Sequence, residues 1–261
     1  MRLVSLHDKD VIEAALRRDP AMHLYELGDL DDFFWPQTTW YGLEDRGALR
    51  SVALVYAADE LPVVIALARE GQTWTVTALL ERMRHILPRR FYAHLAIGAG
   101  RALGAGFVIE PHGLHERMLL TDWGPLEEVD TSVAVPLGPS DARELEEMYA
   151  DAYPANWFDP RMLETGTYFG VRDGDVLASV SGVHVVSRRH RVAALGNVAS
   201  RPQYRGRGFA RIAVAATCLS MRGEIDHLGL NVDAVNAEGL RLYKGLGFDR
   251  IASYEEMRVG T

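Results

Sequence analysis

Cysteine is nearly absent from the sequence. Cys218 stands alone among 261 residues, so the chain cannot close a disulfide within itself. A lone thiol is usual in the reducing cytoplasm. Long apolar runs are also missing, because residues 61–68 form only a strand-sized stretch and a membrane helix needs about 20 such residues. The first eight residues lack the apolar core of a signal peptide. We therefore expect a cytoplasmic protein that does not enter a membrane.

Basic residues are outnumbered. Lys and Arg total 28 against 36 Asp and Glu, which gives a net charge of −8. A chain with this negative charge is repelled by nucleic acid and by an anionic membrane, so neither is an expected partner. A cationic small molecule or a peptide amine suits it better. The 48% hydrophobic and 25% charged composition is that of a globular protein, which we expect to be a monomer or a homodimer.

The chain has one clear seam, at residues 122–130, where turn formers stand beside an acidic cluster. The first half predicts strands at 2–6, 38–43, 48–57, 61–68, 91–96 and 118–120, and helices at 11–16 and 74–87. The second half predicts strands at 132–136, 167–171, 175–186, 192–200, 228–232 and 250–259, and helices at 141–152, from 209, and at 237–246. The same α+β order occurs twice, so we expect a domain at 1–124, a linker at 125–131 and a second domain at 132–261. Each domain should hold a mixed, mostly antiparallel sheet flanked by helices.

The segment between the predicted strand 192–200 and the helix that begins at Phe209 carries the clearest chemistry. Gly206 and Gly208 allow a tight turn and bring backbone N–H groups close to a ligand. The first N–H groups of the helix are unpaired and lie at its positive end, so together these groups form a cradle for an anion such as a diphosphate. Neither a P-loop nor a dinucleotide fingerprint fits, because no Lys-Ser/Thr pair follows Gly208 and Arg211 stands where a third glycine is needed.

Two motifs together resemble one family. The pattern Gln203-x-x-Gly206-x-Gly208 is similar to the acyl-CoA-binding signature of the GNAT superfamily of N-acetyltransferases. Downstream, Asn236 and the run Leu242-Tyr243-Lys244-Gly245-Leu246-Gly247-Phe248 look like the cofactor-side Asn and the closing helix of that family. The order and spacing extend the resemblance over residues 132–261. It implies two tandem GNAT-like domains, of which the second transfers an acetyl group from acetyl-CoA to a primary amine in a ternary complex.

The resemblance also implies a role for each matching residue. The backbone of Val198 and Ser200 would pair with the pantetheine arm, and the Val198 N–H would polarise the thioester carbonyl. Tyr243 would be the general acid that protonates the departing thiolate. The remaining residues expected to bind acetyl-CoA are Gln203, Arg205, Gly206, Arg207, Gly208, Phe209 and Asn236.

The general base is left open. Some family members carry a Glu on the strand before the glycine loop, and Ala194 occupies that position here. Proton removal through water is one alternative, and His184 on a neighbouring strand is another. The aromatic and acidic segment 151–159 either holds a cationic amine by charge and cation–π contact or forms a lid over its own core.

Other patterns stay secondary. His112 and His115 lack the second His of a zinc helix, so no metal site is expected. The glycine-rich segment 98–106 is interpreted as a degenerate acyl-CoA loop of the first half, and residues 29–40 either belong to the core or form one wall of a substrate cleft. Two further functions remain open: a CoA-binding sensor or interaction protein without catalysis, and transfer of an acyl group longer than acetyl.

Overall fold

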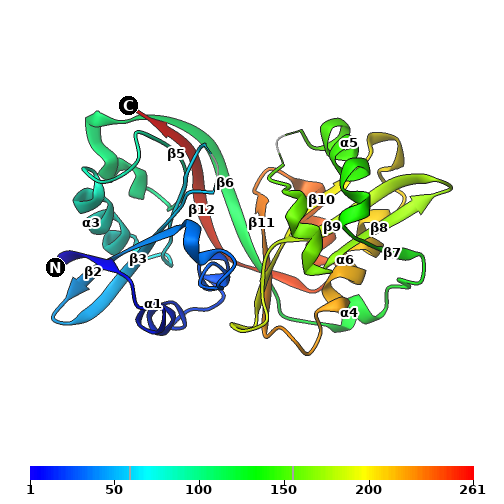
Figure 1. The fold of residues 1–261 in the computed structure, drawn as a ribbon, viewed down its shortest axis with the longest axis horizontal. Coiled ribbons are helices and arrows are strands. Elements are labelled where there is room, and N and C mark those ends of the chain that lie inside the picture. Colours follow the sequence, from blue (N-terminus) through cyan, green and yellow to red (C-terminus); the bar gives the residue numbers. More distant parts are fainter. Residues whose placement is uncertain (59, 155) are drawn as a thin grey trace. The chain divides into compact units, whose positions relative to one another are not determined.

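The computed structural model describes residues 1–58, 60–154 and 156–261, which form two compact units (Figure 1). The first unit comprises Met1–Met118, Val232–Ala237 and Arg250–Thr261, and the second comprises Leu119–Asn231 and Glu238–Asp249. No helix of the described residues is both long and apolar enough to span a membrane.

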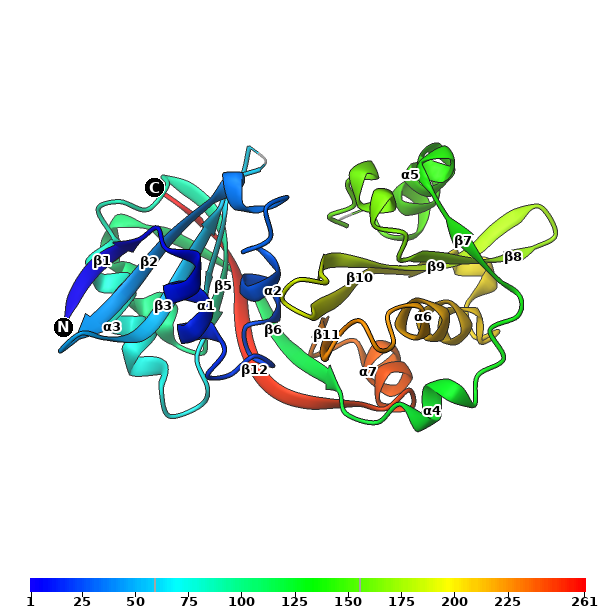
Figure 2. The same cartoon turned by 60° about the horizontal axis from the view of Figure 1, so that its bottom comes forward.

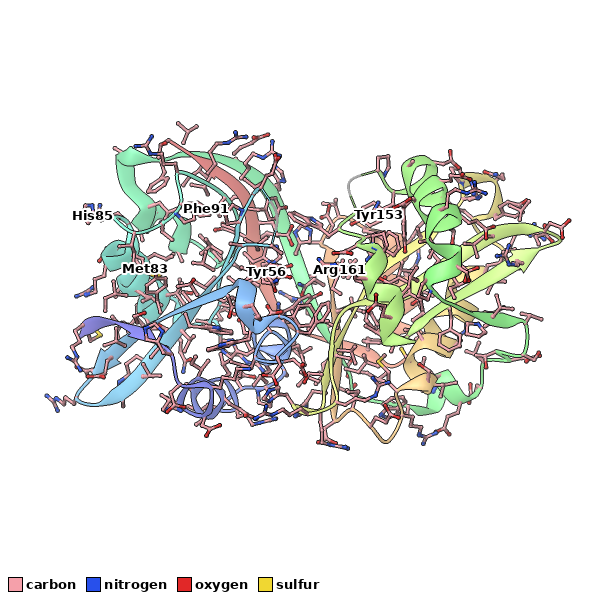
Figure 3. The ribbon with its side chains drawn as sticks, in the orientation of Figure 1. Tyr56, Met83, His85, Phe91, Tyr153 and Arg161 are labelled. Atoms are coloured by element: carbon pink, nitrogen blue, oxygen red, sulfur yellow. The ribbon has the colours of Figure 1, made fainter. Side chains whose placement is uncertain are left out.

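The first unit is built on a mixed sheet with strand order β1-β2-β3-β4-β5-β12-β6. Its elements are β1 (Arg2–Leu6), α1 (Lys9–Leu16), α2 (Leu24–Gly28), β2 (Thr38–Asp45), β3 (Ala48–Tyr56), β4 (Val63–Ala66), α3 (Thr73–Met83), β5 (Arg90–Ala96), β6 (Val108–Leu120) and β12 (Phe248–Gly260), with 3-10 helices η1 (Trp35–Gln37) and η2 (Ala99–Gly106). The apolar side of α3 packs on this sheet. Its residues Leu79 and Met83 share a core with Phe91 of β5, and Figure 3 labels Met83 and Phe91.

The second unit repeats this plan with strand order β11-β10-β9-β8-β7. Its elements are α4 (Gly124–Glu127), β7 (Ala134–Leu137), α5 (Ala142–Ala152), β8 (Tyr168–Asp173), β9 (Val176–Ser187), β10 (Val192–Ser200), α6 (Phe209–Ser220), β11 (His227–Asp233) and α7 (Ala237–Lys244), with 3-10 helices η3 (Pro139–Asp141), η4 (Pro160–Thr165) and η5 (Pro202–Tyr204). Figure 2 shows α5 and α6 on opposite sides of strands β9 and β10.

The repeat is clearest in one parallel pair of strands in each unit. β4 runs parallel to β5, and α3 connects them. β10 runs parallel to β11, and α6 connects them in the same way. Antiparallel pairing joins β1 to β2, β2 to β3, β3 to β4, β5 to β12, β7 to β8, β8 to β9 and β9 to β10. Two copies of one mixed α+β plan, as the sequence predicts, are therefore present.

The C-terminal strand differs from the expected domain boundary. Residues 254–260 of β12 pair antiparallel with residues 90–96 of β5, so Arg250–Thr261 lies in the first unit rather than beside residues 132–249. The pattern of alternating residues in this segment predicts a strand, but such a pattern does not say which sheet the strand joins.

The glycine-rich segment 98–106 also differs from its prediction. It forms η2 after β5, whereas the turn that follows the parallel strand β4 and begins α3 is 67–72. The counterpart of the Gly206 turn in the first unit is therefore 67–72, and 98–106 is not a degenerate acyl-CoA loop. Glycine content and a preceding strand do not reveal the parallel pairing that defines the position of this turn.

Residues 29–40 contribute to the core in part. Trp40 is 1% exposed and stacks on Trp35, while Phe33 is 54% exposed. Asp29 is a buried carboxyl group at the end of α2, close to the buried Glu26. Burial, and to a smaller extent the charge of Glu26, raise the pKa of Asp29 well above its usual value. The folded protein therefore holds a proton on this carboxyl group to higher pH than the unfolded chain does.

The histidines of this unit surround another carboxyl group. His94 and His115 each place Nε2 3.5 Å from an oxygen of Glu256, which also accepts hydrogen bonds from Tyr92 and Tyr254. Burial is the largest single influence and raises the pKa of Glu256, but the charges of the two histidines and the two tyrosine hydrogen bonds together outweigh it, so the pKa is lowered. His112 lies beside the hydroxyl of Tyr92, at 3.2 Å.

Because the folded-state pKa of Asp29 is raised, its contribution to stability is lost as pH rises from the unfolded value of about 4 through the folded value. We expect Asp29→Asn to raise the melting temperature at pH 8 by about 3 °C, and this gain should vanish near pH 4. Thermal unfolding of both proteins across this pH range measures the effect, with the exposed Asp175→Asn as control. An equal effect at both pH values would contradict the assignment.

Candidate active site

Strands β10 and β11 part from each other midway. They pair from Val192↔His227 to Leu195↔Leu230, and no later pair is found among the residues that the structure describes. On its other edge, β10 stays paired with β9 as far as Ser200↔Ser179. From residue 196 onward, β10 therefore has a neighbour on one edge only.

A β-bulge lies at the start of this open stretch. Gly196 pairs with Gly182 and Ala199 pairs with Val180, so Asn197 and Val198 together stand opposite one residue of β9. Asn197 has a φ of 54°, a left-handed conformation that Asn adopts more readily than most residues.

The bulge decides which backbone groups face the open edge. Arg201 donates its N–H to the Ala178 carbonyl of β9 at 3.0 Å, and Ala199 pairs with the same strand. Because successive residues of a strand direct their N–H and C=O groups to alternate edges, Val198 and Ser200 direct theirs away from β9. These are the two residues that the sequence analysis expected to face a ligand.

The glycine loop follows directly. Gly206 and Gly208 have φ values of 74° and 81°, and Gly208 is the residue before α6. A Cβ built on either would meet no atom within 4 Å, so both positions border open space. In the described structure, the N–H groups of residues 206–211 have no backbone acceptor, whereas Ile212 donates to the Gly208 carbonyl. The first turn of a 12-residue helix and its preceding loop thus present a row of free donors, as an anion cradle requires.

The cations around this cradle are partly neutralised. Arg207 pairs with Asp173 at 2.8 Å and lies over the ring of Phe209, 4.7 Å from its centroid. Arg205 places Nε 3.4 Å from the Ser200 carbonyl. Both arginines and Gln203 are exposed at the loop. The potential anion site therefore depends more on main-chain N–H donors than on the charges of Arg205 and Arg207.

Tyr243 lies on α7, half-buried, with its ring edge-to-face against Phe248 at 6.0 Å between centroids. Burial raises the pKa of its phenol, and the nearby Tyr153 phenol and Cys218 thiol act in the same direction. A free phenol has a pKa of about 10. The structure gives a weaker acid, which remains protonated through the physiological range.

The glycine of the same motif has a structural role. Gly247 has a φ of 91°, and a Cβ there would overlap the carbonyl oxygen of Asp122. The N–H groups of Thr121 and Asp122 donate to the Gly247 carbonyl. Only glycine permits this close approach. Asn236 immediately precedes α7 but belongs to the segment that groups with the first unit, so its contact with a cofactor stays a prediction.

No carboxylate stands at the position of a possible general base. Ala194 is fully buried between Gly229 of β11 and Val185 of β9. The imidazole of His184 instead lies directly over Gly196, because a Cβ on that glycine would overlap the ring. His184 is therefore a titratable side chain beside the strand that opens at residue 196.

The segment after α5 divides between core and surface. Phe158 packs between Tyr149 and Tyr168, at 5.0 and 5.9 Å between ring centroids. Tyr153, labelled in Figure 3, and Trp157 are each 42% exposed. Its two carboxylates are already paired, Asp151 with Arg201 and Asp159 with Arg161, which is also labelled. Ala155 lies outside the described residues. Both carboxylates of this segment are thus paired, and two of its aromatic rings are partly exposed.

These features define an acyl-CoA-dependent transferase fold, and sequence comparison gives the family. Residues 136–248 match the model of the acetyltransferase (GNAT) family. This segment, which contains β10, β11, the glycine loop, α6 and α7, is therefore a GNAT-family acetyltransferase domain. The family predicted from the two motifs is confirmed. No curated protein sequence matches the chain.

Solved structures share the fold over nearly the whole chain. A Drosophila protein matches with a TM-score of 0.72 and 14% identity, over 98% of this chain and 97% of that one. A GCN5-related N-acetyltransferase from Sphaerobacter thermophilus matches at 0.59 and 16%, over 98% and 94%. A tandem GNAT protein from the clavulanic acid biosynthesis pathway matches at 0.57 and 14%, over 99% and 98%. At these identities the likeness concerns the fold, and it confirms the predicted tandem GNAT-like architecture.

We expect Gly208→Val to weaken coenzyme A binding at least about tenfold. The left-handed conformation costs a branched residue about 1–2 kcal/mol, so the backbone should leave it and turn the loop amides away from the ligand. Calorimetric titration measures the dissociation constant. Gly223→Ala is the matched control, since Gly223 has a φ of 82° with no atom near its Cβ position at the far end of α6. Equal affinities of both variants and the unmodified protein would show that the loop does not hold the ligand.

Proposed function

We propose that this protein transfers an acetyl group directly from acetyl-CoA to a primary amine, with both substrates bound at once. The observation that carries the proposal is two neighbouring stretches of open main-chain groups, one at Val198 and Ser200 on the unpaired edge of β10 and one at the free amides of residues 206–211. An extended pantetheine arm can add to a strand edge, and a diphosphate suits a helix N-terminus. The residues present therefore fit acetyl-CoA, which supplies an activated thioester.

Backbone groups would make most of the contacts with acetyl-CoA. The amides of residues 206–211 would hold the diphosphate, with Arg205, Arg207 and Gln203 at its rim and Phe209 at the start of the helix. Ser200 would pair with the arm. The Val198 N–H would donate to the thioester carbonyl oxygen and stabilise the negative charge that develops there as the amine attacks, an interaction worth about 3 kcal/mol in comparable sites.

Two proton movements complete the reaction. The attacking amine must lose a proton, either to His184 or to water, as its nitrogen bonds to the carbonyl carbon. The carbon–sulfur bond then breaks, and the leaving sulfur takes a proton from the Tyr243 hydroxyl. The buried phenol is a weak acid, so this transfer depends on the sulfur leaving into an environment where its own thiolate is also poorly solvated.

A binding role without catalysis is the second candidate. Ala194 in place of a carboxylate and the raised pKa of Tyr243 favour it. It predicts that coenzyme A stabilises the protein against heat while no amine releases thiol from acetyl-CoA. A panel of donors with longer acyl chains, tested in the same assay, decides the size of the transferred group.

We expect Tyr243→Phe to lower kcat by about 10²-fold, the usual effect of losing a general acid, and to leave the dissociation constant of coenzyme A within about twofold, because the cradle amides are untouched. Thiol release over a panel of primary amines gives kcat, and calorimetry gives the affinity. Tyr254→Phe is the control, since it removes a buried phenol of the first unit and should keep the full rate. Retention of full rate by Tyr243→Phe, with chemistry limiting, would remove Tyr243 from the mechanism.

A further inference from the structure

The β-bulge at Asn197 is fixed by side chains that the reaction itself does not use. Asn197 is 2% exposed and sits in a left-handed conformation at the point where β10 opens. Left-handed backbone at a residue other than glycine costs free energy and persists only where the surroundings hold it. The contacts around Asn197 therefore indicate what holds it.

Two tyrosines provide these contacts. The Tyr149 hydroxyl of α5 donates to the Asn197 carbonyl oxygen at 2.7 Å. The Asn197 side-chain amide donates to the Tyr168 hydroxyl at 2.9 Å, and that hydroxyl donates to the Val183 carbonyl of β9 at 3.1 Å. The Tyr168 hydroxyl and the Asn197 amide also lie 3.4 and 3.5 Å from Met162 Sδ, whereas Asn197 Oδ1 is buried with no hydrogen-bond partner among the described residues.

The network joins elements on both sides of the bulge. Tyr149 comes from α5, Tyr168 from β8 and Val183 from β9, and Phe158 packs between the two tyrosine rings. Tyr149 and Tyr168 are 2% and 0% exposed. Burial raises the pKa of both phenols, so each hydroxyl keeps the proton that it donates. The Tyr168 ring also lies over Gly182, the cross-strand partner of Gly196, where a Cβ would overlap it.

We infer that Tyr149, Tyr168 and Asn197 are positioning residues that hold the bulge so that the Val198 N–H points to the open edge of β10. This inference rests on the proposed function, because it assigns the orientation of the amide that would polarise the thioester. Val198 follows Asn197 directly, so a rotation of the Asn197 peptide changes the direction of the Val198 N–H.

The consequences for binding and for reaction differ. The cradle at residues 206–211 is held by the start of α6 and by Gly206 and Gly208, not by the tyrosines. Loss of the Tyr149 hydroxyl should therefore leave coenzyme A affinity nearly unchanged and lower the rate of the acyl transfer step. A merely structural role would lower thermal stability without separating these two quantities.

Tyr149→Phe tests the inference, because it removes the hydroxyl and keeps the ring. We expect kcat to fall about tenfold, as a small misplacement of a reacting group would cause, with coenzyme A affinity within about twofold. Asn197→Gly is the second variant, since glycine tolerates the left-handed backbone and lacks the amide that reaches Tyr168. It should show the same separation. Tyr254→Phe is the control, a fully buried tyrosine of the first unit that donates to Glu256 at 2.7 Å, and should lose stability only.

A second measurement does not require an acceptor amine. In nitrogen-15 NMR, acetyl-CoA but not coenzyme A should shift the Val198 amide downfield in the unmodified protein, because only the former brings a carbonyl oxygen. Tyr149→Phe should reduce this difference by half or more. A full difference in that variant, or unchanged kcat in both variants, overturns the positioning role. No difference in the unmodified protein would refute the assignment of Val198 itself, and the inference with it.

Discussion

The candidate active site depends on backbone N–H and C=O groups of the second unit that make no main-chain hydrogen bond within the described residues. Parallel strands β10 and β11 stop pairing after Leu195 and Leu230, and the bulge at Asn197 and Val198 marks the place. Unpaired backbone groups inside a protein are costly unless something satisfies them. A ligand with extended amide groups and a diphosphate can satisfy this edge and the free amides of the next loop together.

The same architecture explains why side-chain chemistry is sparse here. Ala194 provides no base, Arg207 is neutralised by Asp173, and burial makes Tyr243 a weaker acid than a free phenol. An enzyme built on oriented backbone dipoles needs few ionised side chains, because fixed N–H groups stabilise developing charge without reorganising. Such a site also requires that the backbone be held firmly, which is the work assigned to Tyr149, Tyr168 and Asn197.

Local sequence signals predicted much of this structure. Gly206 and Gly208 permit the positive φ values of a tight turn, and the amphipathic pattern from Phe209 predicts a helix. The loop and α6 lie where these signals predict them. Long-range pairing was beyond such signals. The strand predicted at 250–259 is present, yet its partner is β5 of the first unit. The prediction for the glycine-rich segment 98–106 is wrong because it, too, depended on long-range pairing. Only the parallel pairing of β4 with β5 shows that 67–72 is the counterpart of the Gly206 turn. The Asn197 network joins β10 to α5, β8 and β9, and its members lie far apart in the sequence, so local patterns could not predict it.

Hydrogen–deuterium exchange with and without coenzyme A tests the central claim most directly, because it reports on individual main-chain amides. The account predicts that the ligand slows exchange of the amides at residues 206–211 and at Val198 and Ser200, while the turn at 67–72 in the first unit is unaffected. Binding that protects other segments and leaves those amides exchanging at their original rates would contradict it.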